Sequence, residues 1–242
     1  MKRHVAGAVT TLVSAARKEV SVVAALCAMA GGLFLFIHLA EETGEGDTHA
    51  FDMAVLSRLR RPDAPAVPIG PHWLTTSARD LTSLGSTTIL VFLGLSAIGF
   101  LMMQGRRAAA LLVLGSVGGA LALSNGLKLV FQRARPDAAF RAIEATQFSF
   151  PSGHALISTA VYLTLGALIA HAIRERSLKL YVQLLAVLLV FAIGLSRIYL
   201  GVHWTTDVLA GWGMGAAWAM ALWLITWWIE RRSRLALGEA AP

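Results

Sequence analysis

Charged side chains are scarce in this sequence. Asp, Glu, Lys and Arg make up 14% of the 242 residues, whereas 56% are hydrophobic. A soluble domain usually carries about a quarter charged residues. The shortage excludes an ordinary water-soluble protein and indicates that much of the chain lies in a lipid bilayer. Cysteine is nearly absent as well: Cys27 is the single one, so an intrachain disulfide is impossible.

Acidic residues are fewer than basic ones, which gives a net charge of +7. Such an excess can mark a nucleic-acid-binding protein. Here, however, the charges form short clusters between apolar runs, with no basic stripe among aromatic residues, and we expect no nucleic-acid partner. The histidines lack the spacing of metal ligands, so we expect neither a metal ion nor another cofactor.

Six apolar runs approach the length that a helix needs to cross a bilayer, about 20 residues. They are residues 20–40, 81–103, 108–131, 155–173, 180–196 and 205–229. The first run is too long for the apolar core of a cleaved signal peptide, so we expect it to remain as an anchor. No internal repeat or long linker divides the chain. The sequence predicts an all-α integral membrane protein, with a single domain over residues 1–242 and a bundle of six transmembrane helices.

The clusters of Lys and Arg follow every second apolar run, which places them on one side of the membrane. The residues on this side are Lys2, Arg3, Arg17, Lys18, Arg106, Arg107, Arg174, Arg176, Lys179, Arg231, Arg232 and Arg234. Cytoplasmic loops of membrane proteins carry the excess of Lys and Arg. We therefore expect both termini in the cytoplasm, and the connections 41–80, 132–154 and 197–204 on the opposite side.

The longest connection, residues 41–80, begins with acidic residues and continues over 51–61 with apolar residues among arginines. This pattern fits two structures equally well: an amphipathic helix on the outer membrane surface, or an ordinary solvated helix. Four prolines between positions 62 and 71 should end any helix before the second apolar run begins.

Polar and ionisable residues gather near the non-cytoplasmic ends of the last four runs. Three segments contain them: 128–136, 151–154 and 196–207. Helices joined by short connections are antiparallel neighbours, so these segments should meet at the outer membrane face. Ionisable groups near or inside a membrane are costly and usually functional. We therefore expect one shared site.

Three cations of this site, Lys128, Arg135 and Arg197, have few acidic residues near them in the sequence. The guanidinium group of arginine matches the geometry of phosphate oxygens. Ser152 and Gly153 come just before an apolar run, where the backbone N–H groups of a helix N-terminus favour an anion. The residue types thus predict a site for a phosphoryl group.

Two histidines can supply the chemistry at such a site. His203 and Asp207 are four residues apart, which places them on one face of a helix. The carboxylate can accept a hydrogen bond from one ring nitrogen and leave the other free to attack phosphorus. His154 begins another helix and could protonate a leaving alkoxide. A two-step reaction through a phosphoenzyme is therefore possible without a metal.

Three linked motifs in these segments resemble the signature of a known family. They are Lys128-x6-Arg135-Pro136, Pro151-Ser152-Gly153-His154 and Ser196-Arg197-x5-His203-x3-Asp207. All eleven specified positions agree, in the family's order, with the type 2 phosphatidic acid phosphatase superfamily. The resemblance covers roughly residues 80–230 and is closest to the membrane branch of the family, while residues 1–80 fit only in general plan.

The resemblance implies a role for each matched residue. His203 would form a phosphohistidine, Asp207 would orient it, and His154 would act first as acid and then as base. The residues that would hold the phosphate oxygens are Lys128, Arg135, Ser152, Gly153 and Arg197. Members of the family need no metal ion. Their likeness implies a lipid phosphate as substrate and a site at the outer face of a bacterial inner membrane, facing the periplasm or exterior.

Four functions fit these residues to different degrees. A lipid phosphatase is the leading one, with undecaprenyl pyrophosphate, phosphatidylglycerol phosphate and phosphatidate as candidate substrates. A lipid phosphotransferase would pass the same phosphate to a lipid or sugar acceptor, and the motifs do not separate it from a hydrolase. Six spans count against a vanadium-dependent haloperoxidase, which is generally soluble. Intact His203, Asp207 and His154 argue against a non-catalytic transporter.

Several other residues receive a structural interpretation. We interpret Arg133, Arg141 and His171 as interfacial anchors. Arg79 and Asp80 could line the entrance of the site, but a local helix cap with a flanking charge is the favoured interpretation. Gly211 and Gly215 form a small-xxx-small pair, which favours close helix packing within the bundle over dimerisation. The sequence does not predict an oligomeric state.

Overall fold

The computed structural model describes residues 2–236, with side chains over 19–229 and at Arg231 and Arg232. Part of the predicted cytoplasmic charge lies outside the described side chains, namely Lys2, Arg3, Arg17, Lys18 and Arg234. The elements in chain order are α1 Lys2–Glu45, α2 His49–Arg58, β1 Arg60–Arg61, β2 Ala64–Pro68, α3 His72–Ser83, α4 Thr87–Met103, α5 Arg107–Phe131, the 3-10 helix η1 Ala138–Phe140, α6 Gly153–Ala172, α7 Arg176–Tyr199 and α8 Thr205–Ala236.

Five helices of the described chain are long and apolar enough to cross a membrane. They are α5, α6, α7, α1 over Glu19–Glu45 and α8 over Thr205–Ile229. A sixth span results if α3 and α4, which meet at an angle of 44°, are counted together. The predicted all-helical membrane fold is therefore confirmed. The seventeen residues that were predicted as the fifth span belong to a longer helix, α7, of 24 residues.

The predicted second span, residues 81–103, is interrupted in the structure. Helix α3 continues to Ser83, and α4 begins only at Thr87. Ser86 separates them because its backbone is extended and its Oγ accepts a hydrogen bond from the backbone N–H of Ile89 (3.4 Å). A serine that caps a helix in this way satisfies one of the free N–H groups at its start.

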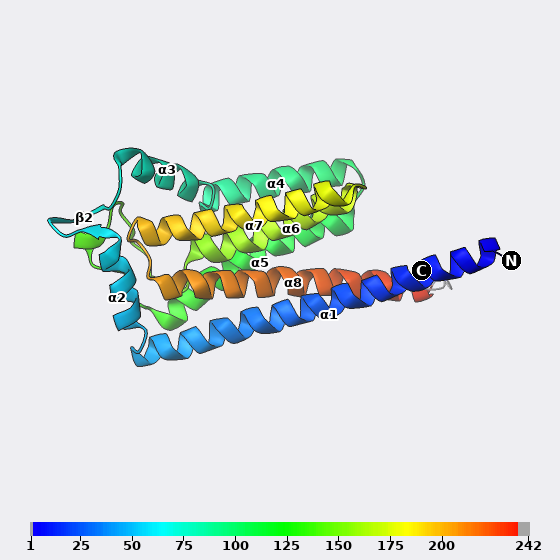
Figure 1. Ribbon diagram of the computed structural model, residues 1–242, viewed down its shortest axis with the longest axis horizontal. Coiled ribbons are helices and arrows are strands. Elements are labelled where there is room, and N and C mark those ends of the chain that lie inside the picture. Colours follow the sequence, from blue (N-terminus) through cyan, green and yellow to red (C-terminus); the bar gives the residue numbers. More distant parts are fainter. Residues whose placement is uncertain (1, 237–242) are drawn as a thin grey trace.

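The membrane helices form an elongated bundle, with α1 lying along α8 (Figure 1). The start of α1 and the end of α8 lie at one end of this bundle, and α2, β2 and η1 lie at the other. Large indoles fill the space between helices where a glycine faces them. The ring of Trp218 occupies the place of a side chain at Gly119, and the ring of Trp212 does the same at Gly194.

Glycines bring the backbones of neighbouring helices close together. A Cβ atom at Gly211 would lie 2.8 Å from the carbonyl oxygen of Ser152, and one at Gly215 would meet the carbonyl of Leu156 at 2.5 Å. Both glycines therefore pack α8 against α6. The prediction that this pair serves packing within the bundle is confirmed.

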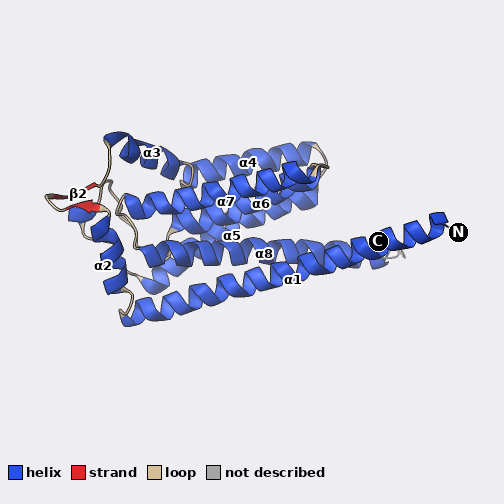
Figure 2. Cartoon of the chain, in the orientation of Figure 1, coloured by secondary structure: helices blue, strands red, loops and turns tan. Residues whose placement is uncertain are grey.

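The segment between the first two spans holds a helix, as both alternatives predict, and two strands that neither predicts. Helix α2 is short, and it packs onto the protein through the buried side chains of Asp52 and Leu56 while Phe51 is exposed. Two short antiparallel strands follow, with Arg60 opposite Pro68, so the described chain is not purely helical (Figure 2). The prolines of this segment fit an edge strand, where a missing N–H group costs little.

Candidate active site

One end of the bundle brings the three polar segments together. Lys128 lies in the last turn of α5, His154 in the first turn of α6, and Arg197 in the last turn of α7. Residues 200–204 then form a tight turn into α8. Gly201 has a φ of +72°, a conformation that glycine adopts at little cost, and a side chain there would collide with the Arg60 guanidinium and the carbonyl of Phe140. This turn places His203 just before α8.

His203 and Asp207 form the pair that their spacing predicts. The Nδ1 atom of His203 lies 3.3 Å from Oδ2 of Asp207, and both side chains are almost completely buried. The other ring nitrogen, Nε2, lies 3.1 Å from Nη1 of Arg135. Burial and the positive charges of Arg135, Arg197 and Lys128 hold the pKa of His203 well below its ordinary value. The imidazole is therefore neutral at physiological pH.

The three cations of the site have no carboxylate partner among the described residues. Lys128 donates through Nζ to the carbonyl of Phe148 (2.6 Å), and Arg197 donates to Oγ1 of Thr82 (2.9 Å). Arg135 donates to the carbonyl oxygens of Gln147 and Val202. Burial lowers the pKa of Arg135 to about 10, so the side chain remains charged at neutral pH. Buried cations without a carboxylate are suited to bind an anion.

The start of α6 completes this positive environment. Ser152 caps the helix, since its Oγ accepts from the backbone N–H of Ala155 (3.4 Å). Gly153 lets α5 approach, because a Cβ atom there would lie 2.9 Å from Oγ of Ser124 and 3.6 Å from Cε of Lys128. The helix N-terminus and the ammonium group can therefore face the same anion.

His154 lies among the same charges. Its ring interacts electrostatically with His203 and with all three cations of the site. Within the described part of the chain, neither of its ring nitrogens has a hydrogen-bond partner. Gly85, in the break between α3 and α4, leaves room for this ring, since a Cβ atom there would lie 3.3 Å from its Cδ2. The imidazole is thus available to a ligand.

Two residues that hold Asp207 were missed in the sequence. The interpretation of Arg133 as an interfacial anchor is wrong. Its Nη1 donates to Oδ1 of Asp207 (2.6 Å), and its Nη2 donates to Oδ2 of Asp52 (2.8 Å). Ser149 is fully buried and donates to Oδ2 of Asp207 (2.5 Å). Nothing in the sequence distinguishes Arg133 from an ordinary charge near the end of a span.

Two further interpretations are wrong for a similar reason. Arg79 lies within α3 and donates to the carbonyl of Ala142 (3.0 Å), so it is not part of a cap. Arg141 donates to the carbonyls of Pro136 and Ala145 rather than anchoring the chain at the interface. Both arginines stabilise the 136–145 loop over the site. His171 is exposed at the end of α6, where its interpretation as an anchor stays a prediction.

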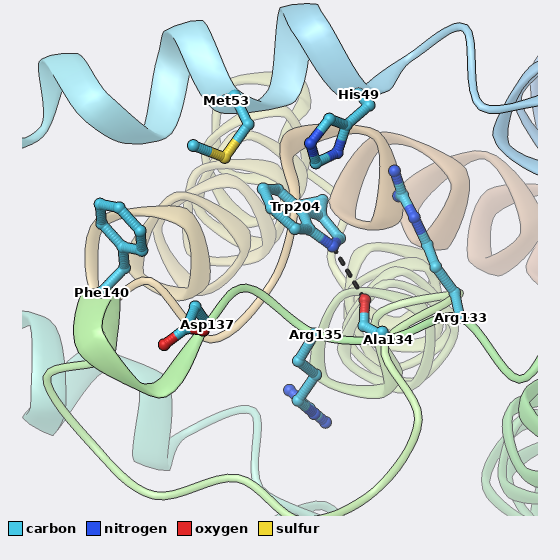
Figure 3. Close-up of a pocket in the computed structure, with 8 residues that line it drawn as sticks. All are labelled: His49, Met53, Arg133, Ala134, Arg135, Asp137, Phe140 and Trp204. Carbon is cyan, nitrogen blue, oxygen red and sulfur yellow. Dashed lines mark hydrogen bonds between the residues drawn. The ribbon is translucent and has the colours of Figure 1, made fainter.

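A pocket of about 460 Å³ lies beside this site, between α2 and the 133–140 segment (Figure 3). His49 and Met53 of α2 form one wall, and Trp204 lies across from them. The indole is fixed because its Nε1 donates to the carbonyl oxygen of Ala134 (2.9 Å). Arg135 also contributes to the lining, so the pocket adjoins the residue that contacts His203.

A helical membrane bundle that buries a histidine–carboxylate pair beside three cations has the features of a membrane enzyme acting on phosphate esters. Residues 109–231 match the family model of the PAP2 superfamily, and the chain belongs to this superfamily. It is thus a multi-pass membrane hydrolase of a superfamily of metal-independent lipid phosphatases.

Three similar proteins have been characterised in microorganisms. The chain is 36% identical over 152 residues to phosphatidylglycerophosphatase B of Bacillus subtilis, covering 62% of this chain and 74% of that one. It is 35% identical over 149 residues to decaprenylphosphoryl-5-phosphoribose phosphatase of Mycobacterium tuberculosis, covering 60% and 76% of the two chains. It is also 35% identical over 71 residues to undecaprenyl-diphosphatase of Sulfolobus acidocaldarius, a shorter match that covers 29% of this chain and 30% of that one.

A solved structure shares the fold as well. The crystal structure of a transmembrane PAP2 type phosphatidylglycerolphosphate phosphatase from Bacillus subtilis superposes with a TM-score of 0.73 at 27% sequence identity. The superposition covers 85% of this chain and 98% of the other. The similarity therefore extends beyond residues 109–231 into the N-terminal part of the chain.

Proposed function

We propose that this enzyme hydrolyses a phosphate monoester or pyrophosphate on a lipid, through a phosphohistidine at His203. The observation that carries the proposal is the environment of the His203 ring. One nitrogen faces Asp207, and the other faces a group of three cations that lack a carboxylate partner in the described chain. An anion bound by those cations would bring its phosphorus atom next to Nε2.

The residues support a reaction in two steps. In the first, Nε2 of His203 attacks phosphorus, a P–N bond forms, and the P–O bond to the lipid breaks while His154 gives its proton to the leaving oxygen. In the second, His154 takes a proton from water, the oxygen attacks phosphorus, and the P–N bond breaks to release phosphate. Asp207 accepts from Nδ1 of His203 throughout, which stabilises the positive charge on the ring. Lys128 and Arg197 balance the charge on the phosphoryl oxygens.

We infer that the site faces the periplasm or exterior of a bacterial inner membrane. Arg106 lies just before α5, Arg176 begins α7 and Arg231 lies near the end of α8. These helix ends lie at the end of the bundle where α1 begins (Figure 1). The positive-inside rule assigns that end to the cytoplasm. The site lies at the opposite end, at the level where a lipid presents its headgroup.

The names of the relatives suggest the kind of lipid. They act on phosphatidylglycerol phosphate, on a decaprenyl-linked phosphoribose phosphate and on undecaprenyl diphosphate. Phosphatidylglycerol phosphate is our first candidate, because it is the substrate named both for the B. subtilis relative and for the superposed structure. A prenyl pyrophosphate and phosphatidate are the next candidate substrates.

Phosphate release from purified lipid phosphates tests the proposal. Wild type and His203→Ala would be assayed in detergent with EDTA on phosphatidylglycerol phosphate, phosphatidate and undecaprenyl pyrophosphate. We expect release by wild type on at least one lipid and none by His203→Ala. Transfer of label to an added lipid alcohol or sugar without release of phosphate would instead establish the phosphotransferase alternative.

A further inference from the structure

Helix α2 lies outside the spans, yet one of its carboxylates is buried against the active site. Asp52 is 1% exposed. Its Oδ1 accepts from the backbone N–H of Thr206 (3.0 Å), and its Oδ2 accepts from the hydroxyl of the same residue (2.7 Å). A buried carboxylate is costly unless it is paired and hydrogen-bonded in this way. Asp52 therefore attaches α2 to the turn of α8 that also carries Asp207.

Arg133 joins this carboxylate to the one beside the nucleophile. Its two terminal nitrogens contact different partners: Nη1 lies 2.6 Å from Oδ1 of Asp207, and Nη2 lies 2.8 Å from Oδ2 of Asp52. Nη2 also donates to the hydroxyl of Thr48 at the start of α2 (3.1 Å). The guanidinium group is planar and rigid. The position of α2 therefore determines where the guanidinium holds Asp207.

The pairing with Arg133 determines which oxygen of Asp207 faces the histidine. Oδ1 accepts a hydrogen bond from Arg133. Oδ2 therefore accepts the remaining ones, from Ser149 Oγ (2.5 Å), the backbone N–H of Trp204 (2.9 Å) and Nδ1 of His203 (3.3 Å). Rotation of the carboxylate would break several of these bonds together. Nδ1 of the imidazole thus has a fixed acceptor, and Nε2 is directed toward the cations.

We propose that Arg133 and Asp52 are positioning residues, which act through Asp207 to aim the His203 ring at the phosphorus atom. The inference rests on the proposed function and deepens it. Segment 41–80 then has a definite role: α2 is part of the framework of the active site. A plain stabilising ion pair would affect folding alone, whereas positioning residues affect the chemical step.

The test compares Arg133→Lys and Asp52→Asn with wild type and with Arg58→Gln, which removes an exposed charge from the same α2 helix. For each purified protein, kcat, KM and the inhibition constant of inorganic phosphate are measured. We expect Arg133→Lys to lower kcat about 100-fold, as small misplacements of reacting groups do, because one ammonium group cannot bridge both carboxylates. KM and phosphate inhibition should stay within about twofold, since the three cations are untouched.

Asp52→Asn keeps the Arg133–Asp207 pair and should lower kcat less, by about tenfold. If Arg133→Lys does not fold, the kcat of Asp52→Asn tests the inference in its place. Values of kcat within about twofold of wild type for the folded variants would overturn the inference. A loss of kcat with an equal loss of phosphate inhibition would also overturn it, because the whole site would then have collapsed.

A second measurement does not depend on activity. Nitrogen NMR of histidine-labelled protein reports which ring nitrogen of His203 carries the proton, with His203→Gln used to assign the signal. We expect the Nδ1-protonated form in wild type and a mixture in Arg133→Lys. If these two spectra were seen but wild type released no phosphate, the proposed function would be rejected. The role of Arg133 in orienting the His203 ring would still be supported. An unchanged spectrum in the folded variant would reject the inference.

Discussion

The Nε2 atom of His203 lies 3.1 Å from Nη1 of Arg135. A guanidinium nitrogen can only donate, so Nε2 accepts and the ring proton belongs to Nδ1, on the side of Asp207. The lone pair that accepts from Arg135 is the one that would attack phosphorus. A bound phosphoryl oxygen would take over the Arg135 donor, which exposes the nucleophile only when a substrate is present.

His154→Ala should affect substrates according to their leaving groups. A lipid alkoxide needs a proton as it leaves, whereas an aryl oxide needs much less. We expect kcat/KM to fall by about 100-fold or more on the lipid phosphate and by a much smaller factor on an aryl phosphate. Steady-state assays with both substrates check this. Equal losses on the two would contradict the role of His154 as acid.

Gly153→Ala should move the start of α6 away from the phosphate-binding cations. The added methyl group would lie 2.9 Å from Ser124 Oγ on α5, which is too close, so the two helix ends must separate. We expect phosphate inhibition to weaken by about tenfold, which corresponds to the loss of roughly one charged hydrogen bond. The matched control is Gly126→Ala on α5, where a Cβ atom meets nothing within 4 Å. Equal inhibition of both variants and wild type would show that this contact is unimportant.

Thr82→Val tests the link between the bent α3–α4 pair and the site. The Thr82 hydroxyl accepts from Nη1 of buried Arg197 (2.9 Å). Without it the guanidinium loses a fixed partner, and we expect KM to rise by about fivefold with kcat less affected. Thr76→Val removes an exposed hydroxyl that contacts only its own helix and serves as control. A KM equal to that of the control would contradict the prediction.

The activity should survive mild acid. The pKa of His203 is held well below its ordinary value of 6.5 by burial and by neighbouring cations, so the ring binds a proton only at lower pH. The nucleophile therefore stays neutral as the pH falls through about 6.5. The rate of phosphoenzyme formation, corrected for the ionisation of the substrate measured by phosphorus NMR, should therefore not fall from pH 7.5 to about 5.5, a range in which His154 can only gain the proton that it donates. A corrected rate that halves near pH 6.5 would argue for an ordinary histidine.

Much of this site could be predicted because its residues follow local rules. His203 and Asp207 are separated by one helical turn, and Ser152 lies at a helix start, so their placement depends only on helix geometry. The apolar runs predicted the spans for the same reason. Long charged side chains at the ends of antiparallel helices, such as Lys128 and Arg197, could also be assigned to one membrane face.

The remaining partners depend on contacts between distant parts of the chain. Asp52 and Thr82 lie on segments whose position is set by packing, and no periodic pattern marks a carboxylate or hydroxyl that will be buried. Arg133 was misinterpreted because a charge near a span end is usually an anchor. The break at Ser86 was missed because Leu81 and Leu84 make the apolar run after it look as if it began earlier. The two short strands were missed for a similar reason, because prolines mask a weak strand signal.

Trapping of the phosphoenzyme shows directly whether His203 carries the phosphoryl group. The protein would be mixed with a lipid phosphate labelled in the phosphoryl group, quenched within milliseconds in alkaline detergent, and digested for peptide mapping. We expect label that is stable to alkali and lost in acid, on the peptide containing His203, and none in His203→Ala. Release of phosphate by wild type without such label, or label that persists in His203→Ala, would contradict it.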